Sequence, residues 1–275
     1  MLLQNWVRNV NLSLGFANSS EKAKSYCELG VEHYKQKQYQ EAVKFLTQAI
    51  ACHVESGEAY GHRARAYFKL KRYAKALQDC DRAIQLNPKD AIAYTTRAGA
   101  NFQLGNSQKA RQDCDRAIDI NPNLTKAYYY RGVACCQLKQ YQVAITDFSQ
   151  VIAANPYLTQ AYYNRGVAKF SSGDLKGAIE DYNETLALDR NYANAYYNRG
   201  LAHTSLGHKR QAFFDWRQAA DLFLMKGQMS VYNKAVKLMA SSPLAKQKSH
   251  EEPDQMIQRS MEKLDTDPML SKVVR

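Results

Sequence analysis

Polar and apolar positions follow helical spacing through most of the chain. In residues 125–158 a first stripe is spaced i, i+3, i+4 and i+7: Tyr128, Arg131, Gly132 and Cys135. A second stripe follows after a short break: Ala144, Phe148, Val151 and Ile152. Two short helices cannot bury such faces alone, so the pattern predicts a helix pair that stacks on neighbouring pairs.

The same pattern returns every 34 residues. A tyrosine, a small residue and an alanine recur in register: Tyr26, Tyr60, Tyr94, Tyr128, Tyr162 and Tyr196; Gly30, Ala64, Ala98, Gly132, Gly166 and Gly200; Ala42, Ala76, Ala110, Ala144, Ala178 and Ala212. The period divides the chain into six repeats, 23–56, 57–90, 91–124, 125–158, 159–192 and 193–226. Positions are numbered 1 to 34 within each repeat.

Three features predict how a repeat folds. The small residue at position 8 lets the two helices approach closely. Gly105, Gly173 and Gly207 stand between the helices, where a left-handed backbone is expected. The Asn-Pro steps at Pro88 and Pro122 end a repeat, because proline disfavours helix in the preceding residue.

Both ends of the array differ from the repeats. Residues 1–22 predict an amphipathic helix through Leu3, Trp6, Val7, Val10 and Leu14. It either packs on the first repeat or binds a membrane or partner, although its polar side carries only Arg8, too little for a basic membrane face. Residues 227–240 predict a capping helix, and 241–275 a flexible tail whose segment 256–264 can alternatively form a short helix on a partner.

The period and its residues resemble the tetratricopeptide repeat (TPR) family, which has an aromatic at position 4, Gly or Ala at 8, Ala at 20 and 27 and Pro at 32. The resemblance covers about three quarters of the chain. It implies an all-α, right-handed superhelix (α-solenoid) of six helix-turn-helix repeats with a C-terminal capping helix. It also implies that the first helix of each repeat lines a concave groove for a partner protein.

Arginine at position 7 and aspartate at position 23 occur together in repeats two to six, and both are missing from the first repeat, which has Leu29 and Phe45. The joint pattern predicts structural ion pairs, within one repeat or between neighbours, from Arg63, Asp79, Arg97, Asp113, Arg131, Asp147, Arg165, Asp181, Arg199 and Asp215. An arginine ladder for phosphate is the alternative, but it leaves the aspartates unexplained.

Composition narrows the class of protein. The 275 residues are 45% hydrophobic and 23% charged, which is typical of a soluble folded chain, and no apolar run predicts a membrane span or secretory signal. Six cysteines without a CxxC pair favour a reduced compartment, so we expect a cytoplasmic protein, of bacterial type by its YYNRG-like repeats.

The sequence contains no HExxH, GxSxG or glycine-rich phosphate motif. We therefore expect no catalysis, no cofactor and no metal site. The second repeat carries +4 of the net charge of +12, more than any other repeat, without forming an evident continuous stripe. Nucleic acid is disfavoured as a partner, and membrane contact is peripheral at most.

In TPR proteins, positions 2, 5, 6, 9, 12 and 13 of the first helix line the groove; we call this the helix-A surface. The predicted partner-binding residues are Arg65, Phe68, Lys69, Phe102, Tyr129, Tyr130, Tyr163, Asn164, Val167, Phe170, Tyr197 and Asn198. The tyrosines at position 5 can instead pack between helices. Position 9 has no asparagine and position 6 no arginine, so the family's carboxylate clamp for chaperone tails is absent.

The function expected from these features is a non-enzymatic adaptor or scaffold that binds a peptide or helical segment of a partner. The alternatives are a basic module for RNA or membrane surfaces and a regulatory subunit of an enzyme complex. A bound acidic segment with aromatic or aliphatic residues is expected to place its charges near Arg65 and Lys69 and its apolar part near Tyr163 and Tyr197.

Overall fold

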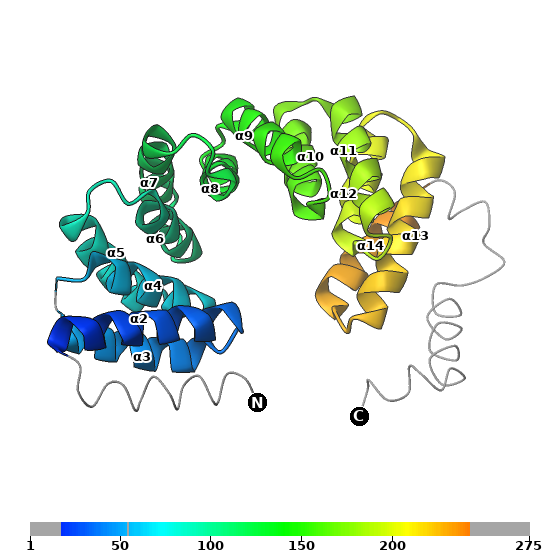
Figure 1. Cartoon of the computed structure of the whole chain (residues 1–275). Coiled ribbons are helices and arrows are strands. Elements are labelled where there is room, and N and C mark those ends of the chain that lie inside the picture. The colour runs from blue at the N-terminus through cyan, green and yellow to red at the C-terminus, as the bar shows by residue number, and fades with distance from the viewer. Residues whose placement is uncertain (1–17, 54, 243–275) are drawn as a thin grey trace. The chain divides into compact units, whose positions relative to one another are not determined.

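The computed structural model describes residues 18–53 and 55–242, which are helical throughout apart from short connections, with no strand in that part of the chain (Figure 1). The helices are α2 (Ser19–Lys35), α3 (Tyr39–Cys52), α4 (Gly57–Lys69), α5 (Tyr73–Leu86), α6 (Ala91–Gln103), α7 (Ser107–Ile120), α8 (Thr125–Gln137), α9 (Tyr141–Ala154), α10 (Thr159–Ser172), α11 (Leu175–Leu188), α12 (Ala193–Ser205), α13 (Lys209–Met225) and α14 (Met229–Ser241). The predicted all-α class and helical-repeat fold are confirmed. Residues 1–17 of the expected N-terminal helix and 243–275 of the expected tail lie outside the described residues.

The chain divides into two compact units, one up to Ala154 and one from Asn155. In the N-terminal unit the hairpins α2–α3, α4–α5, α6–α7 and α8–α9 follow one another, and the second helix of each hairpin packs on the first helix of the next. In the C-terminal unit α10–α11 and α12–α13 do the same, and α14 packs on α13. Buried Tyr232, Ala235 and Met239 of α14 join the core formed around Trp216 and Phe223.

Helix α2 begins at Ser19, ahead of the first repeat's residue 23, because it has a strong N-terminal cap. The Asn18 side chain accepts a hydrogen bond from the Glu21 N–H at 2.9 Å. The Glu21 carboxylate accepts one from the Asn18 N–H at 3.1 Å. This reciprocal capping box satisfies free backbone donors and sets the start of α2 at Ser19.

The turn inside each repeat requires a left-handed residue at position 15. Gly105, Gly173 and Gly207 adopt φ of 81°, 93° and 79°, as predicted. The other three repeats have a lysine at this position, also with a positive φ: Lys37, Lys71 and Lys139, at φ of 62°, 58° and 59°. A left-handed lysine is less favourable than glycine, so the packing of the two helices imposes the turn in these repeats.

Positions 8 and 24 are complementary in volume. Where position 8 is glycine, position 24 carries a large side chain: Leu46, Phe148, Tyr182 or Trp216. A Cβ added at Gly166 would lie 2.8 Å from Cε1 of Tyr182, and one at Gly200 would lie 2.6 Å from Nε1 of Trp216. The two repeats with alanine at position 8 have buried Cys80 and Cys114 at position 24. Protein interiors are close-packed, so a smaller residue at position 8 is compensated by a larger side chain at position 24, and the reverse.

Each arginine at position 7 binds the aspartate at position 23 of the same repeat through two hydrogen bonds. Arg131 donates from Nε to Oδ2 of Asp147 at 2.9 Å and from Nη2 to Oδ1 at 2.7 Å. The same two-bond geometry joins the remaining pairs: Arg63–Asp79, Arg97–Asp113, Arg165–Asp181 and Arg199–Asp215. The aspartates are buried, so the guanidinium supplies the charge compensation that makes their burial possible.

The same guanidinium also contacts the preceding repeat and the tyrosine at position 4. Nη1 of Arg97 donates to Asp81 at 2.7 Å, and Nη1 of Arg131 donates to Asp115 at 2.9 Å, both at position 25 of the repeat before. Cζ of Arg131 lies 5.5 Å from the ring centre of Tyr128, and the other four arginines lie over their own position-4 tyrosines at 5.3–5.7 Å. One charged group thus joins two helices of a hairpin, stacks on a ring and reaches a neighbouring hairpin.

The first repeat replaces this arrangement with apolar packing. Leu29 is fully buried, and the Phe45 ring stacks on His33 at 5.0 Å and on Tyr26 at 6.5 Å between centres. Apolar and aromatic contacts thus take the place of the ion pair in this repeat.

The volume complementarity predicts a non-additive pair of substitutions. Gly166→Ala is expected to destabilise by about 1–3 kcal/mol, because the added Cβ meets Tyr182. In a chain that already carries Tyr182→Cys, the same Gly166→Ala change is expected to cost nothing, as in the natural Ala64 and Cys80 repeat. Denaturant unfolding followed by circular dichroism measures both.

Gly61→Ala on α4 is the matched control, because its Cβ would lie at an ordinary 3.4 Å from the Asp90 carboxylate. It is expected to be neutral or to stabilise by up to about 1 kcal/mol. Equal costs of Gly166→Ala in the two backgrounds would contradict the proposed complementarity.

Candidate functional site

The predicted partner-binding residues fall in both compact units. The N-terminal unit holds Arg65, Phe68, Lys69, Phe102, Tyr129 and Tyr130, and the C-terminal unit holds Tyr163, Asn164, Val167, Phe170, Tyr197 and Asn198. All except exposed Lys69 are half-buried. Each set is therefore described within its own unit.

In the N-terminal unit, aromatic rings from α4 and α8 meet over α6. The rings of Phe68 and Tyr130 pack edge to face with their centres 6.2 Å apart. A Cβ at Gly99 of α6 would lie 3.0 Å from Phe68 and 3.1 Å from Tyr130. The missing side chain at Gly99 is therefore what lets rings from two non-consecutive hairpins touch.

Cations lie beside these rings. Cζ of Arg65 lies 4.8 Å from the ring centre of Tyr34 on α2. Arg65 is consequently half-buried on an aromatic face. Lys69 follows Phe68 on α4 and Lys126 stands one helical turn before Tyr130 on α8, so the Phe68–Tyr130 contact brings these cations together. Burial and the charges of Arg65 and Lys69 lower the pKa of Lys126.

His62 fixes the orientation of Arg65. Nη1 of Arg65 lies 3.3 Å from Nδ1 of His62, whose Nε2 lies 3.5 Å from the Glu58 carboxylate. Arginine is always a donor, so Nδ1 must accept and Nε2 must carry the proton. Burial and the charge of Arg65 lower the pKa of His62, partly opposed by Glu58, which favours this neutral form.

Tyr34, Gly99 and Lys126 are absent from the residues predicted for this surface. Gly99 carried a signal in the sequence, because position 9 is Val, Arg or Leu in the other repeats. Lys126 at position 2 and Tyr34 at position 12 also stand at groove-lining positions, so the repeat pattern could have found them, although their approach to Arg65 depends on how successive hairpins stack.

In the C-terminal unit the tyrosines at position 5 contact the core. The Tyr163 ring lies 4.9 Å from that of Tyr192 and 6.1 Å from that of buried Tyr182, and its hydroxyl accepts a hydrogen bond from Asn198 at 3.0 Å. Tyr197 packs edge to face on Phe223 at 6.3 Å. These tyrosines have one face in the core, which agrees with the packing alternative considered for position 5.

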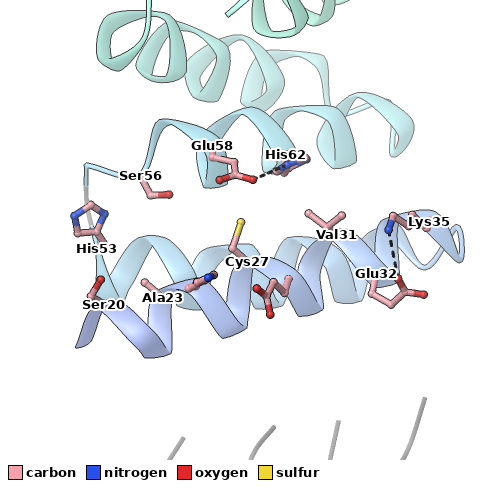
Figure 2. A pocket seen from close by; sticks show the side chains of 12 residues that line it. Ser20, Ala23, Cys27, Val31, Glu32, Lys35, His53, Ser56, Glu58 and His62 are labelled. Atoms are coloured by element: carbon pink, nitrogen blue, oxygen red, sulfur yellow. Dashed lines mark ion pairs between the residues drawn. The ribbon is translucent and has the colours of Figure 1, made fainter. Parts of the chain in front are cut away.

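A further cleft of about 550 Å³ lies between α2 and α4 in the N-terminal unit (Figure 2). Figure 2 shows Cys27 on α2 directed toward Glu58 and His62 on α4. Burial and the carboxylates of Glu58 and Glu28 raise the pKa of Cys27 to about 11. The thiol is therefore protonated near neutral pH and a poor nucleophile.

Burial also raises the pKa of buried Cys80 and Cys114, that of buried Cys135 to about 11 and that of half-buried Cys136 to about 12. Within residues 18–53 and 55–242, no group of three or more His, Cys, Asp or Glu side chains is placed to hold a metal ion. No helix in the described part is long and apolar enough to cross a membrane.

Comparison with protein families gives five matches. Four are to profiles described as "Tetratricopeptide repeat", over residues 23–56, 57–90, 81–125 and 125–158, and one to a profile described as "TPR repeat", over 168–207. Three of these ranges have the bounds of repeats predicted from the period. No curated protein sequence matches the chain.

Solved structures with the same fold include YrrB, a TPR protein with an unusual peptide-binding site, with TM-score 0.58 and 21% identity over 64% of this chain and 91% of that one. MamA from residue 41 to its end, of Desulfovibrio magneticus RS-1, matches with TM-score 0.57 and 22% identity, over 60% of this chain and 94% of that one. A chain of the APC/C hetero-tetramer Cut9–Hcn1 matches with TM-score 0.62 and 18% identity, over 73% and 40%. At these identities the likeness concerns the fold. The repeat profiles and the helical hairpins together show that the chain belongs to the tetratricopeptide repeat family.

Proposed function

We propose that the chain is a non-enzymatic scaffold whose helix-A surfaces bind a segment of a partner protein. The observation that carries this proposal is the group of half-buried rings and cations on the N-terminal unit, Tyr34, Arg65, Phe68 and Tyr130. Aromatic and arginine side chains that keep one face in contact with solvent are the residues that dominate binding energy at protein interfaces.

The similar structures support the same class of function. One is described as a TPR protein with a peptide-binding site, and another belongs to a hetero-tetramer. The raised thiol pKa values and the absence of catalytic motifs favour a binding protein over an enzyme. The reduced cysteines agree with the cytoplasm as its location.

The internal ion pairs weaken the case for nucleic acid. Five of the arginines behind the net charge of +12 are bound to buried aspartates of their own repeats. On α10 and α12 the cations Arg165, Lys169 and Arg199 all pair with aspartates. RNA binding is therefore the weaker alternative, and the crosslinking experiment below separates it from protein binding.

Photo-crosslinking tests the helix-A surface directly. A photoreactive benzoylphenylalanine at Phe102 on α6 is expected to capture a protein from the native cell extract, because position 12 belongs to the proposed surface. The same residue at Phe214 is the control, since that ring is 46% exposed on α13, the second helix of its repeat. Capture at Phe214 alone, or of RNA in place of protein at Phe102, would contradict the proposal.

Paired substitutions test the C-terminal surface. Tyr163→Ala with Tyr197→Ala is expected to weaken binding of the captured partner by about 2–4 kcal/mol, because two contact rings are lost. Tyr163→Phe with Tyr197→Phe keeps both rings and removes only hydroxyls, so it is expected to retain most of the affinity. Calorimetric titration at a temperature where circular dichroism shows both variants folded gives the comparison, and unchanged affinity of the folded alanine variant would exclude these rings from the binding surface.

A further inference from the structure

The charged residues on the first helices of repeats two to four are almost all positive. Helices α6 and α8 contain no acidic residue, and α4 contains only Glu58, which lies against His62. The same helices carry six arginines and lysines: Arg63, Arg65, Lys69, Arg97, Lys126 and Arg131. By contrast, α2 balances Lys22, Lys24 and Lys35 with Glu21, Glu28 and Glu32.

Half of these cations are neutralised inside the fold. Arg63, Arg97 and Arg131 bind buried aspartates of α5, α7 and α9. Throughout residues 18–53 and 55–242, Arg65, Lys69 and Lys126 have no carboxylate within ion-pair distance. Lys69 follows Phe68 on α4 and Lys126 stands one helical turn before Tyr130 on α8, so the contact between these two rings brings the three uncompensated charges to one surface. Their mutual repulsion is relieved when an anion binds there.

The surroundings of these cations are aromatic. Arg65 lies over the Tyr34 ring. Phe68, one helical turn further along α4, packs on Tyr130 above Gly99. Burial, with small contributions from neighbours that include Tyr129 and Tyr34, raises the pKa of Tyr130 to about 12, so its hydroxyl stays protonated and can donate. We call Tyr34, Arg65, Phe68, Lys69, Lys126 and Tyr130 the basic–aromatic patch.

We infer that the basic–aromatic patch binds an acidic segment of a protein partner, in which carboxylates stand next to an aromatic or aliphatic side chain. This inference rests on the proposed scaffold function and names the chemistry of its partner. The carboxylates meet Arg65, Lys69 and Lys126, and the apolar side chain packs on Phe68 and Tyr130. Tyr34 and His62 already orient the Arg65 guanidinium, so less side-chain freedom is lost when it binds.

A short acidic peptide fits the patch better than a nucleic acid does. Phe68 and Tyr130 present an edge-to-face pair and not separate free faces on which successive bases stack. Three unpaired cations match two or three carboxylates, whereas single-stranded nucleic acid is bound along an extended basic groove. Lys126 and Lys69 are exposed, and the four-carbon stem of lysine lets the ammonium group meet carboxylates at different spacings.

Fluorescence anisotropy with the full-length chain tests the inference. The probe is a labelled peptide Glu-Asp-Leu-Phe-Glu-Asp with blocked ends, and its neutral counterpart is Gln-Asn-Leu-Phe-Gln-Asn. Saturable binding of the acidic peptide is expected, at least ten-fold tighter than binding of the neutral one. Arg65→Ala, Lys69→Ala and Lys126→Ala together are expected to weaken it at least ten-fold, and Lys69→Gln with Lys126→Gln, which touches only exposed lysines, at least three-fold.

The control variant removes three exposed cations away from the patch, Lys89→Ala, Lys109→Ala and Arg116→Ala, and has the same net charge as the triple variant. It is expected to bind within two-fold of the wild type. Equal weakening by the two triple variants, no saturable binding of the acidic peptide, or tighter binding of oligouridylate or phosphatidylserine vesicles than of the peptide would each overturn the inference. Crosslinking at Phe102 that persists in the patch variant would overturn it while leaving the scaffold function intact.

Discussion

The guanidinium at position 7 is the group on which the repeats depend. In Arg97 and Arg131, Nε and Nη2 bind the buried aspartate of the same hairpin while Nη1 binds an aspartate of the hairpin before. The plane of each guanidinium also lies over the position-4 tyrosine. Burying an unpaired carboxylate costs stability, so the buried aspartate requires the arginine as its partner. The two parallel hydrogen bonds of the guanidinium also restrict the angle at which the two helices cross. The first repeat avoids this requirement with Leu29 and Phe45.

Because the position-7 arginines are paired inside the fold, only the remaining cations can bind a partner at the surface. A net charge of +12 suggests a broadly basic protein, yet the arginines of the repeat motif are bound to carboxylates. The charge that is left on the first helices of the N-terminal unit is local, at Arg65, Lys69 and Lys126, and it lies beside rings that the fold holds partly exposed. Unpaired positive charge on the first helices of repeats two to four is thereby confined to a small region, while the arginines of the repeat motif stabilise the hairpins.

The period and the position-specific residues predicted most of the fold, because each repeat is a local structure that buries its face on its neighbours. The joint occurrence of Arg and Asp at positions 7 and 23 predicted their contact. It did not predict the hydrogen bond from Nη1 to the aspartate of the preceding repeat. The left-handed turn was predictable at Gly105 but not at Lys139, where tertiary packing overrides the local preference. The approach of Lys126 to Arg65, 61 residues apart, and the partial burial of Tyr163 depend on how hairpins stack, which no single-repeat pattern contains.

The central claim is that the guanidinium and the aspartate stabilise the fold as one unit. A double-mutant cycle on Arg131→Leu and Asp147→Phe, which installs the residue types of the first repeat, measures this most directly by denaturant unfolding. Each single change is expected to cost about 3–5 kcal/mol, because it leaves a buried charge without its partner. The double variant is expected to be more stable than the sum of the single costs by at least about 2 kcal/mol. Additive costs would contradict the account, since they would mean that the two charges contribute to stability independently.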